Sequence, residues 1–90
     1  MCNIKDAERY EKLAQLCVRD KDFKEAKMNY LEAASIYVMN AELLKQEILL
    51  KKANFCYKKS KEVMGEKWDR VLDKKELAKR TLEECAMNKV

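Results

Sequence analysis

Residues 22–37, with the sequence DFKEAKMNYLEAASIY, decide the fold. Aromatic and alanine side chains alternate along this stretch at spacings of three and four residues: Phe23, Ala26, Tyr30, Ala33 and Tyr37. That spacing places all five side chains on one stripe of an α-helix. Because each alanine allows a neighbouring helix to approach closely, the stripe predicts antiparallel helical hairpins. Architectures of this kind usually bind other proteins.

A separate amphipathic helix is predicted before this stretch, over about residues 4–19. Asn3 is its expected N-cap, and Asp6 stands three residues later, as in a capping box. Asp22 is expected to cap the following helix in the same way. The predicted buried stripe of the first helix comprises Ala7, Tyr10, Leu13, Ala14 and Cys17.

Asn40 is the predicted end of the second helix, because asparagine tolerates the left-handed conformation at helix ends. An unbroken helix over residues 23–64 would be about 60 Å long, too long for a domain of this size. A third helix is therefore predicted over residues 41–64, ending at Gly65. Its expected stripe comprises Leu43, Leu49, Leu50, Ala53, Cys56, Tyr57, Ser60, Val63 and Met64.

A fourth helix is predicted after Gly65, with Asp73 and Glu76 as a start signal. Its pattern comprises Trp68, Val71, Leu72, Ala78, Leu82, Cys85 and Ala86. The predicted fold is therefore all-α. It consists of an antiparallel three-helix bundle over residues 1–65 and a C-terminal helical extension over residues 66–90.

Length and composition limit the chain to one domain with a modest core. Its 90 residues include no proline and one glycine, so long linkers are not expected. No run approaches the roughly 18 apolar residues that span a bilayer. The polar N-terminus also lacks the hydrophobic segment of a signal peptide. We expect a cytoplasmic, monomeric protein.

Residue types that support catalysis or metal binding are scarce. The chain has no histidine, so Ser-His and Cys-His nucleophile pairs are excluded, and its four cysteines form no C-x-x-C pair. Cys17, Cys56 and Cys85 fall on apolar helical stripes, where a free cysteine acts as a small hydrophobe. We expect no enzyme activity, no cofactor and no bound metal.

A basic cluster occurs on the predicted third helix, where five lysines alternate with Phe55 and Tyr57. The lysines are Lys51, Lys52, Lys58, Lys59 and Lys61. Such a cluster can bind nucleic acid or anionic lipid, but Glu47 and Glu62 lie on the same helix, and the net charge of the chain is only +4. A solvated face, or a docking site for an acidic partner, is favoured.

The pattern D-F-x-x-A-x-x-x-Y-x-x-A-x-x-x-Y of residues 22–37, preceded by a helix, resembles the microtubule-interacting-and-transport (MIT) domain. That family is a three-helix bundle related to the tetratricopeptide repeat. Ser60-Lys61-Glu62-Val63 resembles the family's small-charged-charged-apolar ending, and Tyr57 matches an apolar position that commonly faces the partner. The tetratricopeptide pattern fits the first two helices almost as well, but the long third helix favours MIT.

The resemblance implies an adaptor that recruits helical or extended peptide tails of filament-forming ESCRT proteins to an AAA ATPase or another effector. Any membrane association would be peripheral and through partners. Lys58 stands where many family members have an acidic residue, which favours a partner with acidic residues at the matching position. The predicted partner-binding residues are Leu31, Ala34, Val38, Ala53, Tyr57, Lys58 and Met64.

Leu31, Ala34 and Val38 form a second apolar stripe on the second helix, and two alternatives exist for it. A partner's amphipathic helix could lie there, between the second and third helices, or the stripe could pack against the fourth helix. The extension over residues 66–90 could accordingly be a fourth helix, a linker or an occluding lid. Alternative functions are a tetratricopeptide-like scaffold fragment and a basic binder of nucleic acid or lipid surfaces.

Overall fold

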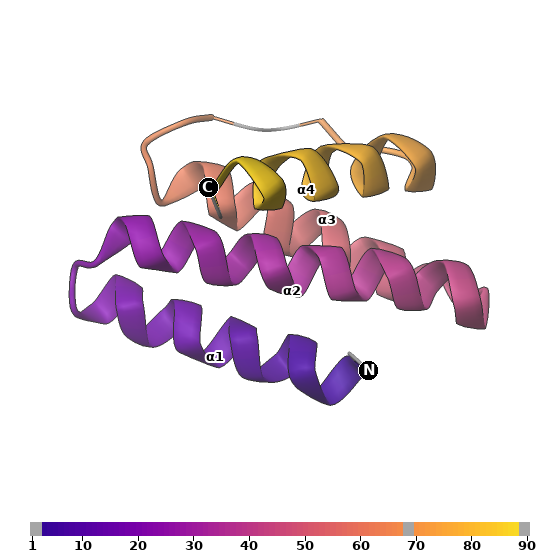
Figure 1. The fold of residues 1–90 in the computed structure, drawn as a ribbon, viewed down its shortest axis with the longest axis horizontal. Coiled ribbons are helices and arrows are strands. Elements are labelled where there is room, and N and C mark those ends of the chain that lie inside the picture. The colour runs from indigo at the N-terminus through magenta and orange to yellow at the C-terminus, as the bar shows by residue number, and fades with distance from the viewer. Residues whose placement is uncertain (1–2, 68–69, 89–90) are drawn as a thin grey trace.

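The computed structural model describes residues 3–67 and 70–88, and this part of the chain forms four α-helices and no strand. Trp68, of the predicted fourth-helix pattern, and Cys2, one of the four cysteines, lie outside the described residues. The central helix α2 contacts the other three and runs in the opposite direction to each of them (Figure 1). The predicted all-α class is confirmed. The helices are α1 (Ile4–Arg19), α2 (Phe23–Leu44), α3 (Glu47–Glu62) and α4 (Lys74–Asn88).

Helix α1 begins and ends as its sequence predicts. The Asn3 side chain accepts a hydrogen bond from the Asp6 N–H, and the Asp6 carboxylate accepts one from the Asn3 N–H, which completes the capping box. Ala7 and Ala14 are buried against the rest of the bundle. The prediction that Leu13 is buried is wrong, because the buried stripe is rotated toward Val18, which packs against the core.

Helix α2 is buried around most of its circumference. Four of the five residues of the aromatic and alanine stripe are buried, but Phe23 is exposed because it is the first residue of the helix. Leu31, Ala34 and Val38, on the second stripe, are also buried. A helix that is apolar on several sides is expected at the centre of a bundle.

The boundary between α2 and α3 differs from the prediction. Asn40 does not end α2, because its side chain donates a hydrogen bond to the Ile36 carbonyl one turn earlier and the helix continues. The break comes at Lys45, whose φ of 52° is left-handed. Leu43 consequently belongs to α2 and is exposed.

Helix α3 ends at Glu62, and the chain is then turned by Gly65, as predicted. Gly65 has a φ of 79°, which is costly for residues with a side chain. The Gly65 N–H donates to the Glu62 carbonyl, and the Glu66 N–H donates to the Lys61 carbonyl. These two bonds form a Schellman motif that closes the helix.

A crossover then returns along the bundle, so that α4 runs in the same direction as α3 (Figure 1). The Asp73 carboxylate accepts a hydrogen bond from the Glu76 N–H at 2.8 Å, which confirms the predicted start signal. The predicted apolar face of α4 is partly wrong, because Ala78 and Cys85 pack against the core as expected but other predicted positions do not. Leu77 and Thr81 are fully buried, whereas Leu82 is exposed.

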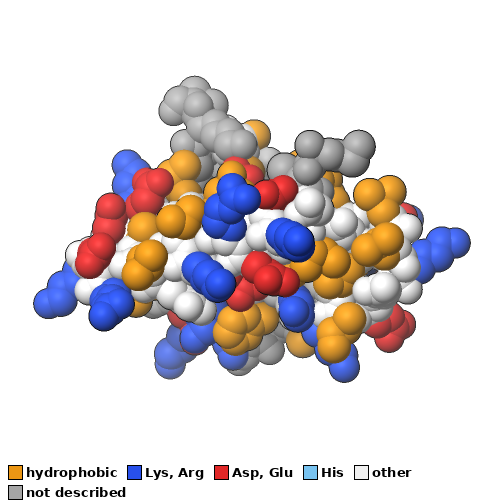
Figure 2. All heavy atoms as spheres, turned by 90° about the horizontal axis from the view of Figure 1, so that it is seen from below, with side chains coloured by type: hydrophobic (Ala, Val, Ile, Leu, Met, Phe, Trp, Pro, Cys, Tyr) orange, Lys and Arg blue, Asp and Glu red, His pale blue; other side chains and the backbone are white. Residues whose placement is uncertain are grey.

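The face seen from the α1 side carries basic, acidic and hydrophobic side chains interspersed with one another (Figure 2). Within residues 3–67 and 70–88, none of the helices combines the length and the apolar composition needed to cross a membrane.

Candidate functional site

The predicted partner-binding residues divide into a buried group and an exposed group. Lys58 and Met64 are exposed. The buried group comprises Leu31, Ala34, Val38, Ala53 and Tyr57, each at most 2% exposed. In this structure the buried group is therefore not an open surface, and its role in partner binding stays a prediction.

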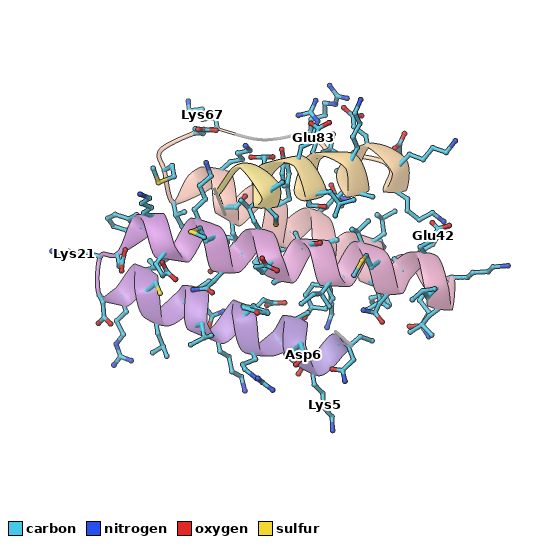
Figure 3. The ribbon with its side chains drawn as sticks, viewed as in Figure 1. Lys5, Asp6, Lys21, Glu42, Lys67 and Glu83 are labelled. Atoms are coloured by element: carbon cyan, nitrogen blue, oxygen red, sulfur yellow. The ribbon has the colours of Figure 1, made fainter. Side chains whose placement is uncertain are left out.

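Helix α4 fills the groove between α2 and α3. Along α2, Leu31, Val38 and Glu42 lie on one face, at spacings of seven and four residues. Glu42, at the C-terminal end of α2, pairs with Lys74 of α4 at 3.0 Å, so this face of α2 is the one turned toward α4 (Figure 3). Of the two alternatives for the second stripe, the structure has the fourth helix packed against it.

A polar contact joins α4 to α3 at the other end of the groove. The Tyr57 hydroxyl donates to one carboxylate oxygen of Glu84 at 2.5 Å, and the Lys61 ammonium donates to the other oxygen. The Lys61 ammonium also lies 5.2 Å from the centroid of the Tyr57 ring. We call Tyr57, Lys61 and Glu84 the carboxylate latch.

The pKa values in this latch reflect its partial burial. Burial raises the pKa of Tyr57, and the hydrogen bond to Glu84 raises it further. Burial alone lowers the pKa of Lys61, but its hydrogen bond to Glu84 and the charge of that carboxylate give a net increase. Both donors therefore keep their protons at neutral pH, which suits the binding of one carboxylate.

The Asn54 side chain attaches the crossover before α4 to α3. Asn54 donates from its amide nitrogen to the Leu72 carbonyl at 3.0 Å, and its amide oxygen accepts from the Leu72 N–H at 2.9 Å. The pair resembles a short piece of β-ladder made with a side-chain amide. Because Leu72 is itself buried, the contact holds the crossover in one position.

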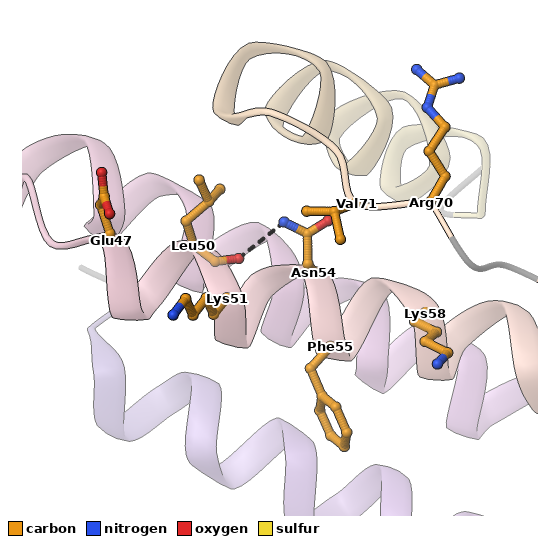
Figure 4. Close-up of a pocket in the computed structure, with 8 residues that line it drawn as sticks. All are labelled: Glu47, Leu50, Lys51, Asn54, Phe55, Lys58, Arg70 and Val71. Carbon is orange, nitrogen blue, oxygen red and sulfur yellow. Dashed lines mark hydrogen bonds between the residues drawn. The ribbon is translucent and has the colours of Figure 1, made fainter.

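A cavity of about 590 Å³ lies on α3 beside the crossover (Figure 4). Phe55 points toward α1, whereas Val71 and Arg70 belong to the crossover side. The lining residues are Glu47, Leu50, Lys51, Asn54, Phe55, Lys58, Arg70 and Val71. Lys58 is the one predicted partner-binding residue among them.

The buried polar groups between α1, α2 and α3 are unsuited to nucleophilic chemistry. Burial raises the pKa of the Cys56 thiol, and the nearby Glu11 carboxylate raises it further. Burial likewise raises the pKa of Tyr30 and Tyr37. A thiol held in its protonated form is a poor nucleophile and a poor metal ligand. The described residues bring together no three side chains of His, Cys, Asp or Glu that could hold a metal ion.

The roles of Asn54 and Glu84 were not predicted from the sequence, and Lys61 was predicted only as part of a basic cluster. An asparagine inside an apolar helical stripe was the available signal for Asn54, because a buried amide needs partners. Glu84 carried no comparable signal, since Glu83 beside it is also acidic.

Comparison with protein-family models, with curated proteins and with solved structures finds no match to this chain. The groove, the carboxylate latch and the cavity are therefore the features from which we infer a function.

Proposed function

We propose that this protein is an interaction module that binds an amphipathic helix of a partner protein in the groove between α2 and α3. The observation that carries the proposal is the occupant of that groove. Helix α4 is amphipathic: among its described residues Leu77 and Thr81 are fully buried, and Glu84 binds the latch. Ala78 and Cys85 of the same helix also pack against the core. A helix of similar pattern from another protein would meet the same contacts.

The contacts of α4 define the pattern expected of the partner. Apolar or small side chains would occupy the positions of Leu77 and Thr81, four residues apart. A carboxylate would follow three residues after the second of them, as Glu84 follows Thr81, and would bind Tyr57 and Lys61. Direction is also specified, because α4 runs parallel to α3.

The resemblance to the MIT domain supports the same groove and suggests a cellular role. On that basis the partner is a helical or extended tail of an ESCRT-type filament protein, and the module is an adaptor for an AAA ATPase or another effector. The bundle formed by α1, α2 and α3 would correspond to the three-helix MIT or tetratricopeptide-like core, with α4 as an addition.

A partner must compete with α4, which is covalently attached. A short connection gives an attached segment an effective concentration on the order of millimolar. Every partner would have to displace α4, so a weakly binding helix would bind only at high concentration. A helix with more apolar contacts would displace α4 at lower concentration. By this competition, α4 would restrict binding to partner helices of high affinity.

A titration with a panel of synthetic amphipathic helices, measured by fluorescence anisotropy at two salt concentrations, tests the proposal. We expect saturable binding of peptides that carry the pattern of α4. The dependence on salt should be weak, because the charge pair that the peptide carboxylate makes with Lys61 is partly buried and is therefore screened little. Steep loss of affinity with added salt, together with equal binding of an oligonucleotide or anionic vesicles, would contradict it.

A further inference from the structure

The cavity beside the crossover is separate from the groove that α4 fills. None of the five buried partner-binding residues lines it. A volume of about 590 Å³ is within the usual range of binding pockets. A ligand could therefore occupy it while α4 stays in place.

The wall of this cavity is held in position by hydrogen bonds. Asn54 fastens the backbone of Leu72, and Arg70 pairs with both carboxylate oxygens of Glu76 at 2.8 and 2.9 Å. The crossover side is thus tied both to α3 and to the first turn of α4. A preformed wall loses little entropy on binding.

The cavity presents large apolar side chains to solvent. Val71 is 82% exposed and Phe55 is 51% exposed. Neighbouring exposed apolar side chains around a concave site commonly mark a contact for another molecule. They predict that the ligand contributes an apolar group.

The rim of the cavity carries unbalanced positive charge. Lys51 and Lys58 are exposed, and neither pairs with a carboxylate among the described residues. Glu47 is the single acidic residue of the lining. The two lysines are seven residues apart, which corresponds to about 10 Å along the helix. The complementary ligand has two negative groups at a similar separation.

We infer that this cavity is a second docking site, for an acidic helical peptide of a partner protein. Two carboxylates seven residues apart on such a helix would face Lys51 and Lys58, and an apolar side chain midway would enter between Phe55 and Val71. A peptide is favoured over nucleic acid because Lys51 and Lys58 are only two cationic groups on one short stretch of α3. A protein that binds a polyanion needs a broad basic surface.

The test uses the full chain and a labelled helical peptide with two glutamates seven positions apart and leucines midway. A second probe has lysines in place of both glutamates. The variant Lys51→Glu/Lys58→Glu reverses both charges of the rim. The control Lys12→Glu/Lys24→Glu makes the same change of net charge at exposed positions on α1 and α2.

We expect the native chain to bind the glutamate probe, and the rim variant to bind it about tenfold more weakly, from the loss of two exposed charge pairs. The rim variant should instead prefer the lysine probe, and the control should behave like the native chain. Val71→Asp should also weaken binding of the glutamate probe, because it places a charge against the apolar group.

Equal weakening in the rim variant and the control would overturn the inference, since it would show only an effect of net charge. The inference would also be overturned if the native chain bound a single-stranded oligonucleotide more strongly than the glutamate probe and the rim variant lost that binding. This result would identify the cavity rim as a nucleic-acid surface. Equal binding of the glutamate and lysine probes by the native chain would contradict the inference without affecting the proposed function.

Discussion

Ala26 and Ala33 determine how closely the neighbouring helices approach α2, and both are fully buried. We predict that Ala33→Leu destabilises the protein by about 1 to 3 kcal/mol, because the larger side chain overpacks a contact with no free space. Urea unfolding measures the change. Ala86→Leu, at an exposed position of α4, is the control and should have almost no effect. Equal unfolding curves for Ala33→Leu and the native chain would mean that this contact is loosely packed.

Asn54 is a polar residue within an apolar stripe of α3, and its side chain holds the backbone of Leu72. Asn54→Ala leaves the buried N–H and carbonyl of Leu72 without these partners, and we predict a loss of about 1 to 3 kcal/mol of stability. Hydrogen exchange at the Leu72 amide should become faster than at the amides of α2. Unchanged exchange at Leu72 would indicate that the crossover is held by its apolar side chain alone.

Single-residue roles could be predicted where the partners are near in sequence. The caps formed by Asn3 with Asp6 and by Asp22 with Glu25 join residues three apart, so local spacing was sufficient. Asn54 and Leu72 are 18 residues apart, and Tyr57 and Glu84 are 27 apart. Contacts of that kind depend on where α4 lies, which local patterns do not determine.

At the scale of elements, α4 depends on the carboxylate latch. The side chains of Lys61 and Glu84 are only 14% and 20% exposed, so the pair is partly desolvated. We predict that Glu84→Gln lowers stability by about 1 to 3 kcal/mol, through loss of charge-assisted hydrogen bonds. Hydrogen exchange should show α4 losing protection while α1, α2 and α3 keep theirs.

The adjacent residue supplies a matched control for this prediction. Glu83 is exposed and lies on the side of α4 away from α2 (Figure 3). Glu83→Gln makes the same change of charge and should leave the protection of α4 unaltered. If Glu84→Gln and Glu83→Gln had the same effect, the latch would contribute nothing to docking.

The starts of three helices agree with the sequence prediction because capping side chains mark them: α1, α2 and α4. The predicted end of α2 at Asn40 was wrong, because asparagine is compatible both with a helix end and with a continuing helix. Lys45, where the turn occurs, belongs to a residue type with no preference for the left-handed conformation.

At the scale of the whole molecule, buried tyrosines and a buried thiol make stability sensitive to alkaline pH. Burial raises the pKa of Tyr30, Tyr37, Tyr57 and Cys56 in the folded state. The unfolded chain, with ordinary values of 9.0 for the thiol and 10.0 for the phenols, loses these protons first as pH rises. The contribution to stability is therefore complete below about pH 9 and is lost at higher pH.

We predict that the free energy of unfolding falls steeply between about pH 9 and pH 11. Urea unfolding across that range measures it, and tyrosine absorbance should show ionisation together with unfolding. Tyr37→Phe removes one buried phenol and should make the decline shallower. If the free energy of unfolding of Tyr37→Phe fell equally steeply with pH, the loss of stability would be due to other titrating groups.

The architecture as a whole was only partly predictable. The all-α class follows from the spacing in residues 22–37 and is confirmed. The place of α4 was left open, because the stripe of Leu31, Ala34 and Val38 is equally suited to a partner helix and to an internal one. The cavity was not predicted from the sequence. It is lined by both Phe55 and Val71, which are 16 residues apart in the sequence and come together only in the folded chain.

We propose that the groove occupied by α4 can accept a helix from another molecule. The most direct measurement is the binding of a labelled peptide with the sequence of residues 70–88 to the full-length Glu84→Lys variant. In that variant the attached α4 loses both latch bonds and places an ammonium beside Lys61, whereas the free peptide keeps its own glutamate.

We predict that this peptide binds Glu84→Lys at least about tenfold more tightly than it binds the native chain, where the attached α4 competes. The Glu83→Lys control should resemble the native chain. A peptide with lysine at the position of Glu84 should not bind. A Glu84→Lys variant that kept α1, α2 and α3 folded, released α4, and still bound no peptide would contradict a binding groove between α2 and α3.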